Sequence, residues 1–552
     1  MSDGLLARLE AATAHGRGVT FLDGPEPEHA SWGRLHDEAA QTAAALQARG
    51  VGPGTRVALL GPTSRSLLTA VRATWLAGAA VIVLPLSPRL GTPDEFRAQT
   101  RGRITLGDVA LTVADPAMVD AARAAEGDTS LITFTELEGH ARVLSADRLD
   151  RPADDPDATA ILQFTSGSTA DPKGVVIPQR CVVHNLDAVA ERAPMEPDRD
   201  VVVSWVPLYH DMGLVFVATN AMITGTEFVL APPTRFVTSP STWTTWMSQY
   251  KATWTVGPNF GLSIAARFLR GSEGLDLSAC RRWGSGSEPI HPEVMEALAD
   301  AGRGHGLDPR ALYAGYGMAE ATVAISLGVV GGGFRADAVD GALLEEELVA
   351  VPAPPDGRAA RRLARCGPPL RGTELRVTDP STGDVLGERR LGEIEVRGPS
   401  VVPGYFRNPD ASAAMFRDGG WLRTGDLGYL AEGDVVVGGR LKDVIMVGGR
   451  NLFPEDLERA AQSVAGVRAG NVIAFGVAAG RRGEGVVIVA ELKEGEPAHV
   501  RDGIARAVRA AVGLRPEDVV LLPVGTLPKT SSGKLRRSVC RDRYRTAELE
   551  AL

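Results

Sequence analysis

Cysteine is scarce in this sequence, and no long apolar run is present. The four cysteines (Cys181, Cys280, Cys366 and Cys540) lie far apart and form no CxxC pair, so neither a zinc site nor a disulfide framework is indicated. The longest apolar stretch, near WLAGAAVIVLPL, is well short of the ~20 residues that span a bilayer. The first residues, MSDGLLARLEAATAHGRG, are too polar and too acidic for a signal peptide. We therefore expect a cytoplasmic protein without stable membrane insertion.

An excess of positive charge is also missing. The formal net charge is -9 at pH 7, whereas a nucleic-acid-binding protein usually presents a basic face. We therefore expect no nucleic-acid partner. The chain has 552 residues, of which 44% are hydrophobic. That is too long for one hydrophobic core, and it predicts two or more globular domains.

Lysine is rare, although basic residues are not. Only six of the 59 basic residues are Lys, at positions 173, 251, 442, 493, 529 and 534. Four of the six lie in loops rich in Gly, Ser or Asp, within the segments DPKG, GRLKDV and PKTSSGK. Lys and Arg are not interchangeable where a compact ammonium must reach an oxyanion. These four lysines are therefore candidate functional residues, and chance placement on surface loops is the alternative.

Hydroxyl-bearing and small residues gather in one loop between two apolar runs, in the stretch LQFTSGSTADPKGVVI at 162–177. The composition suggests a phosphate ligand, yet the spacing differs from the G-x-x-x-x-G-K-[ST] of the common phosphate-binding loop. The residues after Lys173 read as a strand, so no helix N-terminus is predicted to receive the anion. Side chains and backbone amides would hold it instead. Gly167 and Gly174 flank the loop, and we expect each to need a φ that a β-carbon forbids.

Helical and strand-like segments alternate along most of the chain. The ranges 31–50, 66–78 and 181–193 read as helices, and the ranges 56–61, 79–86, 200–208, 226–232 and 252–258 read as strands. This alternation predicts an α/β fold of parallel sheets covered by helices. From about Gly367 the segments become β-rich, and the C-terminal part alternates strand and helix in a compact α+β pattern. We expect a large N-terminal domain at 1–439 and a small mobile C-terminal domain at 440–552.

The segment 331–366 interrupts the alternation. Three glycines, an acidic helical turn, a PAPP bend and a basic run follow one another in it. Composition of this kind is most often found in a mobile surface loop. From the residues alone, the segment is therefore expected to be an insertion on the surface.

Four more short motifs follow the Ser/Thr loop along the chain. They are YGMAEAT with Glu320, GWLRTGDLGYL with Asp426, GGRLKDV with Arg440 and Lys442, and LPKTSSGKLRR with Lys534. Each alone is more often a capped turn than a site, but the whole series in this order is specific. The series resembles the adenylate-forming (ANL) superfamily, which includes acyl- and aryl-CoA synthetases, peptide-synthetase adenylation domains and luciferases. The resemblance covers nearly the whole chain.

The resemblance implies an enzyme that uses ATP and Mg²⁺ to convert a carboxylic acid to its acyl-AMP, with release of pyrophosphate. It implies that Lys173, Glu320 and Lys534 are catalytic, and that Glu320 with Thr169 holds the metal. Lys442 would be the hinge about which the small domain rotates between half-reactions. The residues implied to bind ATP or AMP are Thr165, Ser166, Gly167, Ser168, Thr169, Gly286, Ser287, Glu288, Tyr316, Gly317, Met318, Asp426 and Arg440.

Within the superfamily, two stretches resemble signatures of the fatty acyl-AMP ligases, which load acyl carrier proteins. They are SWVPLYHDMGLV and TVGPNFGLSIAARF. That branch also carries an insertion at the place of 331–366, which packs on the large domain and disfavours the reaction with CoA. In that interpretation Leu343, Leu344, Leu348 and Val349 are packing residues. The acyl pocket implied by the two stretches contains His210, Met212, Phe216, Asn259 and Phe260.

Some residues depart from the pattern of this branch. Val215, Phe216 and Val217 stand where small or polar residues are usual, and Leu452 replaces a usual His. Bulk after MGL would shorten an acyl tunnel, so medium-chain, branched and functionalised acids all stay open.

Several activities remain possible at this point. We expect acyl-AMP formation followed by acyl transfer to the phosphopantetheine thiol of an acyl carrier protein. An acyl-CoA synthetase is one alternative. A non-catalytic nucleotide- or acyl-AMP-binding module is another, although Lys534, Glu320 and Asp426 are all intact. His210 beside Asp211 suggests a hydrolase, but no suitable serine accompanies them.

Overall fold

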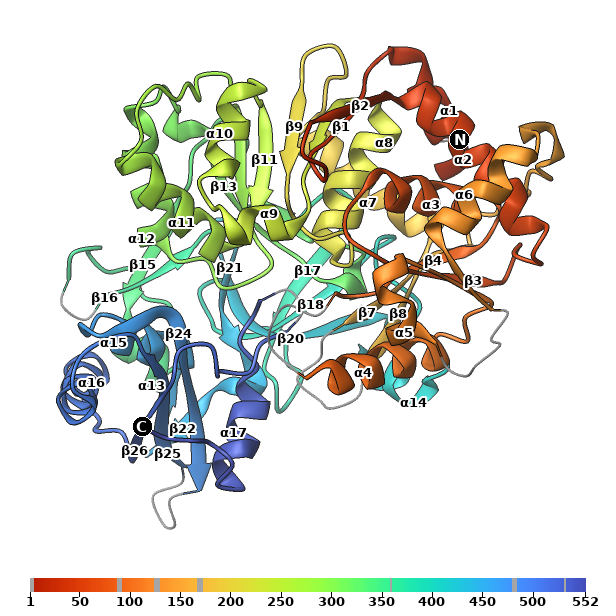
Figure 1. Cartoon of the computed structure of the whole chain (residues 1–552). Coiled ribbons are helices and arrows are strands. Elements are labelled where there is room, and N and C mark those ends of the chain that lie inside the picture. The colour runs from red at the N-terminus through yellow and green to blue at the C-terminus, as the bar shows by residue number, and fades with distance from the viewer. Residues whose placement is uncertain are drawn as a thin grey trace.

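The computed structural model of the chain describes residues 4–86, 92–123, 130–165, 172–357, 360–478, 484–530 and 533–552. Figure 1 shows a large N-terminal part with helices packed around its sheets, and a smaller C-terminal part, coloured blue, below it. This arrangement is the α/β fold that the alternation of helical and strand-like segments predicts.

The first sheet has eight strands in the order β14-β13-β12-β11-β9-β10-β1-β2. Its interior pairs are parallel, and the edge strands β2 and β14 are antiparallel to their neighbours. The strands are β1 Gly18–Phe21, β2 Glu28–Ser31, β9 Val201–Ser204, β10 Glu227–Leu230, β11 Trp254–Gly257, β12 Arg282–Ser285, β13 Leu312–Tyr316 and β14 Ser326–Leu327. Helices α9 Pro233–Thr238, α10 Thr242–Gln249, α11 Asn259–Arg270 and α12 Pro292–Arg303 contribute side chains to the core on one face. The other face packs on a second core that includes the π-helix Met212–Thr219.

The second sheet has the order β6-β5-β3-β4-β7-β8. Its strands are β3 Arg56–Leu60, β4 Ala80–Val83, β5 Leu111–Ala114, β6 Leu131–Thr133, β7 Thr159–Thr165 and β8 Lys173–Pro178. The helices of this region are α1 Leu5–Ala11, α2 Trp32–Gln47, α3 Arg65–Leu76, α4 Pro93–Leu106, α5 Val119–Ala122 and α6 Phe134–Val143, and α7 Gln179–Arg192 and α8 Asn220–Thr224 follow. Strands β7 and β8 are antiparallel, with Thr165 opposite Lys173. The Ser/Thr loop therefore joins strand to strand, as predicted.

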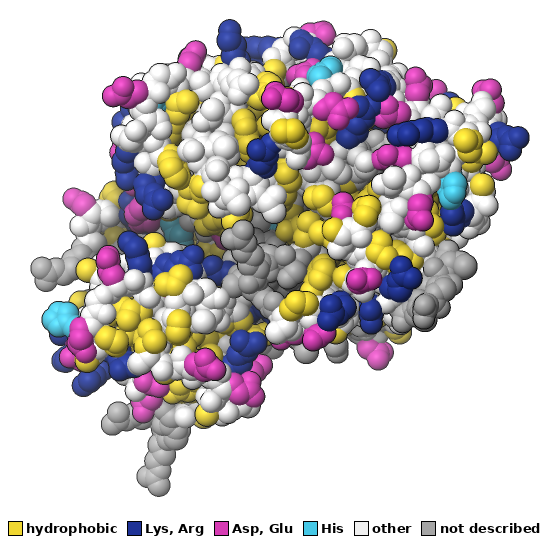
Figure 2. All heavy atoms as spheres, in the orientation of Figure 1, with side chains coloured by type: hydrophobic (Ala, Val, Ile, Leu, Met, Phe, Trp, Pro, Cys, Tyr) yellow, Lys and Arg dark blue, Asp and Glu magenta, His cyan; other side chains and the backbone are white. Residues whose placement is uncertain are grey.

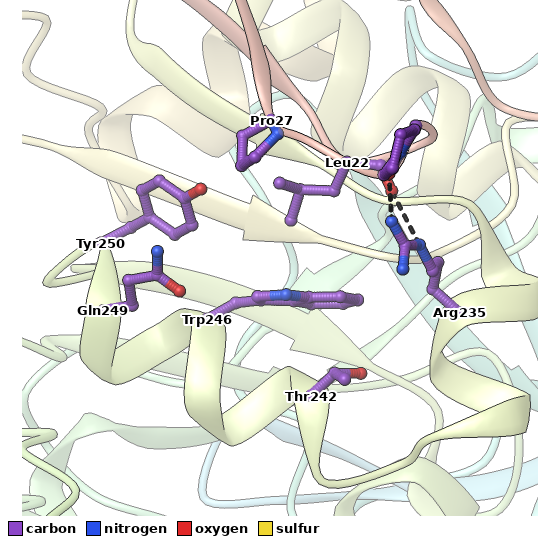
Figure 3. Close-up of a pocket in the computed structure, with 9 residues that line it drawn as sticks. Leu22, Pro27, Arg235, Thr242, Trp246, Gln249 and Tyr250 are labelled. Atoms are coloured by element: carbon purple, nitrogen blue, oxygen red, sulfur yellow. Dashed lines mark hydrogen bonds between the residues drawn. The ribbon is translucent and has the colours of Figure 1, made fainter.

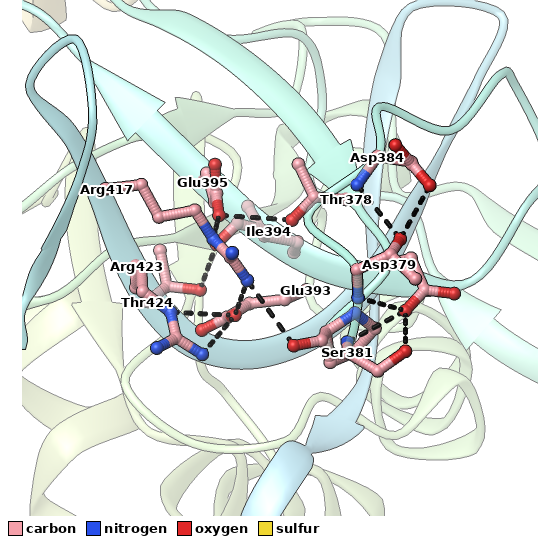
Figure 4. A network of polar contacts seen from close by, with 12 residues as sticks. Thr378, Asp379, Ser381, Asp384, Glu393, Ile394, Glu395, Arg417, Arg423 and Thr424 are labelled. Atoms are coloured by element: carbon pink, nitrogen blue, oxygen red, sulfur yellow. Dashed lines mark hydrogen bonds and ion pairs between the residues drawn. The ribbon is translucent and has the colours of Figure 1, made fainter.

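An antiparallel β subdomain follows, with β17 Glu374–Thr378, β18 Gly392–Arg397, β19 Phe416–Arg417, β20 Trp421–Ala431 and β21 Asp434–Arg440, and with α14 Pro409–Ala414 beside it. Figure 4 shows the polar network that holds β18 to β20. Glu393 is buried and accepts from Arg423 at 2.8 Å, and Thr424 donates to the Ile394 carbonyl at 2.7 Å. The Thr424 hydroxyl also accepts from the Asp426 amide at 3.1 Å. These contacts fix the backbone at Asp426.

The segment 331–366 forms regular structure in its described part. Strand β15 (Ala336–Asp340) pairs antiparallel with β16 (Ala360–Ala364), and α13 (Gly341–Glu346) follows β15 directly. Val339 and Leu344 are fully buried in one cluster with Leu427 and Tyr429 of β20. The expectation of a mobile surface loop, drawn from composition, is wrong for these residues. Of the four leucine and valine side chains implied to pack, Leu344 is buried, whereas Leu343, Leu348 and Val349 are half-buried.

The C-terminal part is an α+β unit with its own cores. Its strands are β22 Ile445–Val447, β23 Arg450–Leu452, β24 Val467–Ala478, β25 Glu484–Leu492 and β26 Asp518–Leu522, and its helices are α15 Pro454–Gln462, α16 Pro497–Val512 and α17 Arg537–Arg545. Strands β24 and β25 are antiparallel, and β26 is parallel to β25. The short 3-10 turn Leu441–Asp443 connects β21 of the large part to β22.

Charged side chains of both signs lie on the surface. Figure 2 shows acidic and basic side chains intermixed over the visible face of the molecule. In the part of the chain that the structure describes, no helix combines the length and the apolar character that a membrane span requires.

Candidate active site

The predicted site residues follow the carboxyl ends of neighbouring strands in the first sheet. His210 and Met212 come after β9, Asn259 and Phe260 come after β11, and the turn 286–288 comes after β12. Tyr316 is the last residue of β13, and Gly317 and Met318 connect it to the 3-10 turn Ala319–Ala321. Because the carboxyl ends of parallel strands meet at one edge of a sheet, these residues gather there.

Lys534 reaches this edge from the small C-terminal part. Its Nζ lies 3.4 Å from Nε2 of His210, which is 324 positions away in the sequence. The His210 Nδ1 lies 2.6 Å from the carboxylate of Asp211. Lys534 is half-buried as a whole residue. Burial of its ammonium group lowers the pKa of Lys534, and this effect outweighs the nearby Asp211 and Glu288 carboxylates, which raise the pKa.

The lowered pKa of Lys534 predicts an alkaline limb in the pH profile of any reaction that uses its charge. Burial makes the folded protein release this proton at a lower pH than a free lysine does. We therefore expect kcat/KM to fall as pH rises through the lowered pKa. Lys534→Arg keeps its charge at every accessible pH, so its profile should lose this limb even if its rate is lower. An identical limb in Lys534→Arg would assign the titration to another group.

Glu320 and Lys173 are connected by a residue that the sequence motifs do not single out. Tyr405 donates its hydroxyl proton to Glu320 Oε1 at 2.8 Å, and the Lys173 ammonium lies 4.8 Å from the centroid of the Tyr405 ring. Glu320 is buried, and burial raises the pKa of its carboxyl. Tyr405 reaches this place because Val175 of β8 forms an antiparallel bridge with it. In the sequence Tyr405 is marked only as an aromatic residue after a glycine, in GYF. Its contact with Glu320 could not be predicted without knowing that its segment pairs with β8.

A second carboxylate stands on the β subdomain. Asp426 accepts from the Tyr316 hydroxyl at 2.9 Å, and the Nε of Arg440 lies 3.2 Å from its other oxygen. Asp426 and Arg440 are opposite each other on β20 and β21. Burial raises the pKa of Asp426, and Arg440 acts against this effect. The structure thus brings three of the predicted nucleotide-binding residues into one contact group.

The backbone of the site is tightly constrained at two places. A β-carbon on Gly317 would lie 1.7 Å from the Val323 carbonyl oxygen, so only glycine fits there. Ser287 has a φ of 71°, unusual for a residue with a side chain, and donates to the Met212 sulfur at 3.4 Å.

Two predicted site residues also support the turns around the site. The Glu288 carboxylate accepts from the Phe260 amide at 2.7 Å, and burial raises its pKa. Asn259 Oδ1 accepts from the amide of His291, which precedes α12, at 3.1 Å. Part of the hydrogen-bonding capacity of both side chains is therefore used within the protein.

Comparison with known proteins identifies the family. The family model described as AMP-binding enzyme matches residues 9–406. The chain belongs to this family. The resemblance to the adenylate-forming superfamily, predicted from the motifs, is thereby confirmed, and the protein is a ligase.

Individual relatives of this AMP-binding enzyme cover nearly its full length. A protein of Mycobacterium tuberculosis named as a ligase is 39% identical over 523 residues, which cover 93% of this chain and 94% of the relative. The 4-hydroxyphenylalkanoate adenylyltransferase of Mycobacterium marinum is 33% identical over 547 residues, with coverages of 94% and 86%. A solved structure from a study of fatty acyl-adenylate ligases of E. coli and L. pneumophila has a TM-score of 0.90 and 30% identity, and covers 99% of this chain and 98% of that one.

The Ser/Thr loop of this AMP-binding enzyme is described only at its ends. Thr165 is the last residue of β7 and Lys173 the first of β8, whereas the predicted residues Ser166, Gly167, Ser168 and Thr169 lie outside the described residues. The expected reason for Gly174 is wrong, because its φ is not in the left-handed region. A β-carbon there would lie 3.1 Å from the Leu162 side chain, so any intolerance comes from crowding.

A metal site built by protein groups alone is not found in the described ranges, where no cluster of three or more His, Cys, Asp or Glu could hold an ion. Glu320 is a single carboxylate. Mg²⁺ is commonly held by one or two carboxylates together with phosphate oxygens of the substrate, and Glu320 fits that arrangement.

Figure 3 shows a separate pocket between the loop after β1 and helices α9 and α10. Its lining includes Leu22, Pro27, Trp246 and Tyr250, and Arg235 donates to the Leu22 carbonyl at 3.1 Å. The nine lining residues include none of the predicted site residues. This pocket therefore does not belong to the site at the strand ends.

Proposed function

We propose that the protein activates a fatty or related carboxylic acid with ATP, and then transfers the acyl group to the phosphopantetheine thiol of an acyl carrier protein. The observation that carries the proposal is the position of Lys534. A lysine from the small domain lies among His210, Asp211 and Glu288, at the edge where Tyr316 and Asp426 also meet. The similarity to a fatty acyl-adenylate ligase structure supports the acid class.

In the first half-reaction, a carboxylate oxygen of the acid attacks the α-phosphorus of ATP. The new bond joins that oxygen to phosphorus, and the bond from the α-phosphorus to the bridging oxygen breaks as pyrophosphate leaves. Phosphoryl transfer depends mainly on positioning and on neutralising charge. Lys534 would neutralise charge at the α-phosphate, and Lys173, beside the Tyr405 ring, would receive the pyrophosphate.

The remaining predicted residues would hold the nucleotide. The Asp426 carboxylate is an acceptor suited to the ribose diol, with Arg440 and Tyr316 fixing its orientation. Glu320 would hold Mg²⁺, and the ionised carboxylate is then favoured despite burial. When bound, the metal supplies positive charge to the phosphate oxygens.

In the second half-reaction the acceptor thiol attacks the acyl carbon and AMP leaves. Contacts between the insertion and the small domain would affect whether the thiol of CoA or that of a carrier protein can reach the acyl-AMP. Glu345 of α13 accepts from Arg450, and its carbonyl accepts from Asn451 Nδ2 at 3.0 Å. These contacts hold the small domain where Lys534 serves adenylation. These contacts would break when the small domain rotates for the second half-reaction. A carrier protein can compensate for the lost contacts through its own interface with the enzyme, whereas CoA offers a smaller binding surface.

The test supplies the purified protein with ATP, Mg²⁺ and a panel of acids, then with either CoA or a holo carrier protein, and separates products by mass. We expect acyl-AMP to accumulate with CoA and the acyl group to move only to the carrier. Rapid acyl-CoA formation would show a CoA synthetase instead. A lack of ATP–pyrophosphate exchange with every acid would show a binding module without turnover.

Lys442 is proposed as the hinge, because it lies in the short turn between β21 and β22, two residues after Arg440. Hinges are a few positions that absorb a large change in φ and ψ. Lys442→Pro fixes φ near -65° and restricts the preceding residue. We expect acyl-AMP to form at a near-normal rate and thiol transfer to slow. Lys442→Ala keeps backbone freedom and is the control, and equal slowing of both half-reactions in Lys442→Pro would indicate a structural role.

A further inference from the structure

The turn that carries Glu320 reverses the chain between two strands of the first sheet. Glu320 lies in the 3-10 turn Ala319–Ala321 after β13, and the chain then returns antiparallel as β14, with Ser326 opposite Tyr316. The reversal is tight, because the amide of Ile325 already donates to the carbonyl of Tyr316 at 2.9 Å. The residues of this short turn therefore determine where the Glu320 carboxylate lies.

Thr322 ends the turn in a strained backbone conformation. Its φ is 71° and its ψ is -61°, and the amide of Val323 donates to the carbonyl of Ala321 at 2.9 Å. These features define a γ-turn with positive φ, which is rare and strained. A positive φ is an outlier for a β-branched residue, whereas glycine adopts it readily. Such strain persists only where the surrounding contacts enforce it.

Two buried side chains supply these contacts. Thr322 is 0% exposed, and its hydroxyl donates to the carbonyl of Ser400 at 2.7 Å. Asn185 of α7 is 1% exposed, and its Nδ2 donates to the carbonyls of Ala324 at 2.8 Å and Ala321 at 3.3 Å. Its Oδ1 accepts from the amide of Ala324 at 3.3 Å. Asn185 therefore binds the chain on both sides of Thr322.

The segment that accepts from Thr322 also holds Glu320. The Glu320 carbonyl accepts from the amide of Val402 at 3.0 Å, and its carboxylate accepts from the Tyr405 hydroxyl at 2.8 Å. The Thr322 hydroxyl bonds to Ser400, two residues before Val402. Thr322 thus fixes the turn to the segment that orients the carboxylate, and a shift between the two would change the place of the carboxylate.

Asn185 links the same turn to the end of the Ser/Thr loop. Helix α7 follows β8 directly, and β8 begins at Lys173. The same strand pairs with Tyr405 through Val175. The lysine that would receive pyrophosphate and the carboxylate that would hold the metal are therefore both fixed to one continuous segment, β8 with α7.

We infer that Asn185 and Thr322 are positioning residues, which hold the Glu320 carboxylate where it meets the metal and the phosphate groups of ATP. The inference rests on the proposed function, in which Glu320 holds Mg²⁺. Both side chains bond to backbone groups, so their effect on the reaction passes through Glu320. Loss of a side chain that orients a metal ligand typically costs ~10–100-fold in metal affinity or activity.

Five variants test the two side chains. Thr322→Val removes the hydroxyl with little change in shape, and Thr322→Ser keeps the hydroxyl as the conservative rescue. Asn185→Leu removes the amide at similar volume, and Asn185→Ser replaces it in the test if the leucine variant does not fold. Thr74→Val is the matched control, because Thr74 of α3 is also 0% exposed and donates to the carbonyl of Ala70 at 2.8 Å.

Two measurements report the place of the carboxylate. Binding of Mn²⁺, as a probe for Mg²⁺, is followed by electron paramagnetic resonance in the complex with α,β-methylene-ATP, which cannot release pyrophosphate. ATP–pyrophosphate exchange is measured against Mg²⁺ concentration. We expect Thr322→Val and Asn185→Leu to weaken Mn²⁺ binding ~10-fold or more, and to raise the Mg²⁺ concentration for half-maximal exchange by a similar factor. The KM for the acid should change little. Thr322→Ser and Thr74→Val should match the wild type.

Each outcome bears on a different statement. If the wild type exchanges with no acid, the proposed function fails and this inference fails with it. If the wild type is active, and Thr322→Val and Asn185→Leu fold and bind Mn²⁺ as tightly as it does, the inference is overturned while the proposed function stands. Thermal unfolding without ligand checks the fold of each variant. A weakening of Mn²⁺ binding that Thr74→Val shares would show a general effect of a lost buried hydrogen bond, and would also overturn the inference.

Discussion

Lys534→Ala is expected to lower the rate of acyl-AMP formation at least ~10²-fold, the usual consequence of losing one stabilising charge at a transition state. The Lys534 ammonium lies 3.4 Å from His210, at the edge where Tyr316, Asp426 and Arg440, which we propose to bind the nucleotide, are in contact. The chain contains only six lysines. Lys534 lies in a Gly/Ser-containing turn of the small domain and contacts the large domain at His210. Its charge would oppose the negative charge that develops as pyrophosphate leaves.

The measurement separates the two half-reactions. ATP–pyrophosphate exchange reports the first, and transfer from synthetic acyl-AMP to the acceptor thiol reports the second, which we expect to survive. Lys529→Ala is the matched control, because Lys529 is half-buried in the same turn and the charges that act on it, Glu491 and Arg468, belong to the small domain. Near-normal exchange in Lys534→Ala would contradict the assignment. Equal loss in both half-reactions would point to a folding defect.

The fold could be predicted from the sequence because its signals are local. The stretch 56–61 reads as a strand and forms β3 at Arg56–Leu60, and 66–78 reads as a helix and overlaps α3 at Arg65–Leu76. Apolar periodicity and turn residues depend on a few neighbouring positions, so they can be recognised in the sequence without knowledge of tertiary contacts. The motifs, which are short and occur in a fixed order, also named Tyr316, Asp426 and Arg440, and the structure brings these three residues into contact.

Features made by contacts between distant segments could not be predicted from composition and periodicity. Composition described 331–366 as a loop, and only the resemblance to the fatty acyl-AMP ligases implied a packed insertion. Val339 and Leu344 are buried against β20, whose sequence lies far downstream. Tyr405 joins Glu320 only because its segment pairs with β8. In each case tertiary packing decides what a residue contacts.

Arg361 of the insertion is the side chain that connects three parts of the protein. It is buried, its guanidinium lies 3.9 Å from the centroid of the Phe453 ring, and its Nε lies 2.7 Å from Asp456 Oδ2. Phe453 and Asp456 belong to the small domain. Arg361 also donates to the Gly438 carbonyl of β21 at 2.9 Å. Through Arg361 the insertion contacts both the small domain and the large domain, in addition to the contacts that Glu345 makes with Arg450 and Asn451.

Arg361→Ala is expected to release the small domain from the arrangement that favours adenylation. Removing one partner of a buried ion pair commonly costs ~3–5 kcal/mol when the other charge is left without compensation. Asp456 also pairs with Arg459 at 2.6 Å, so we expect a smaller cost here. A loss of ~1.4 kcal/mol is enough to shift the balance between two domain arrangements ~10-fold. We expect slower acyl-AMP formation, because Lys534 is then held less often at His210. We also expect acyl-CoA formation to rise ~10-fold or more above the wild-type level.

The neighbouring residue provides the control for this experiment. Arg362 carries the same charge one position further along, but it pairs with Glu296 of α12 within the large domain. Arg362→Ala should therefore leave the choice between CoA and carrier protein unchanged. Thermal unfolding of both variants, followed with the product assay, separates release of the small domain from loss of the fold. If Arg361→Ala folds normally and makes no more acyl-CoA than the wild type, the insertion does not restrict the acceptor through this contact, and the preference for a carrier thiol must arise from the acceptor's own binding surface.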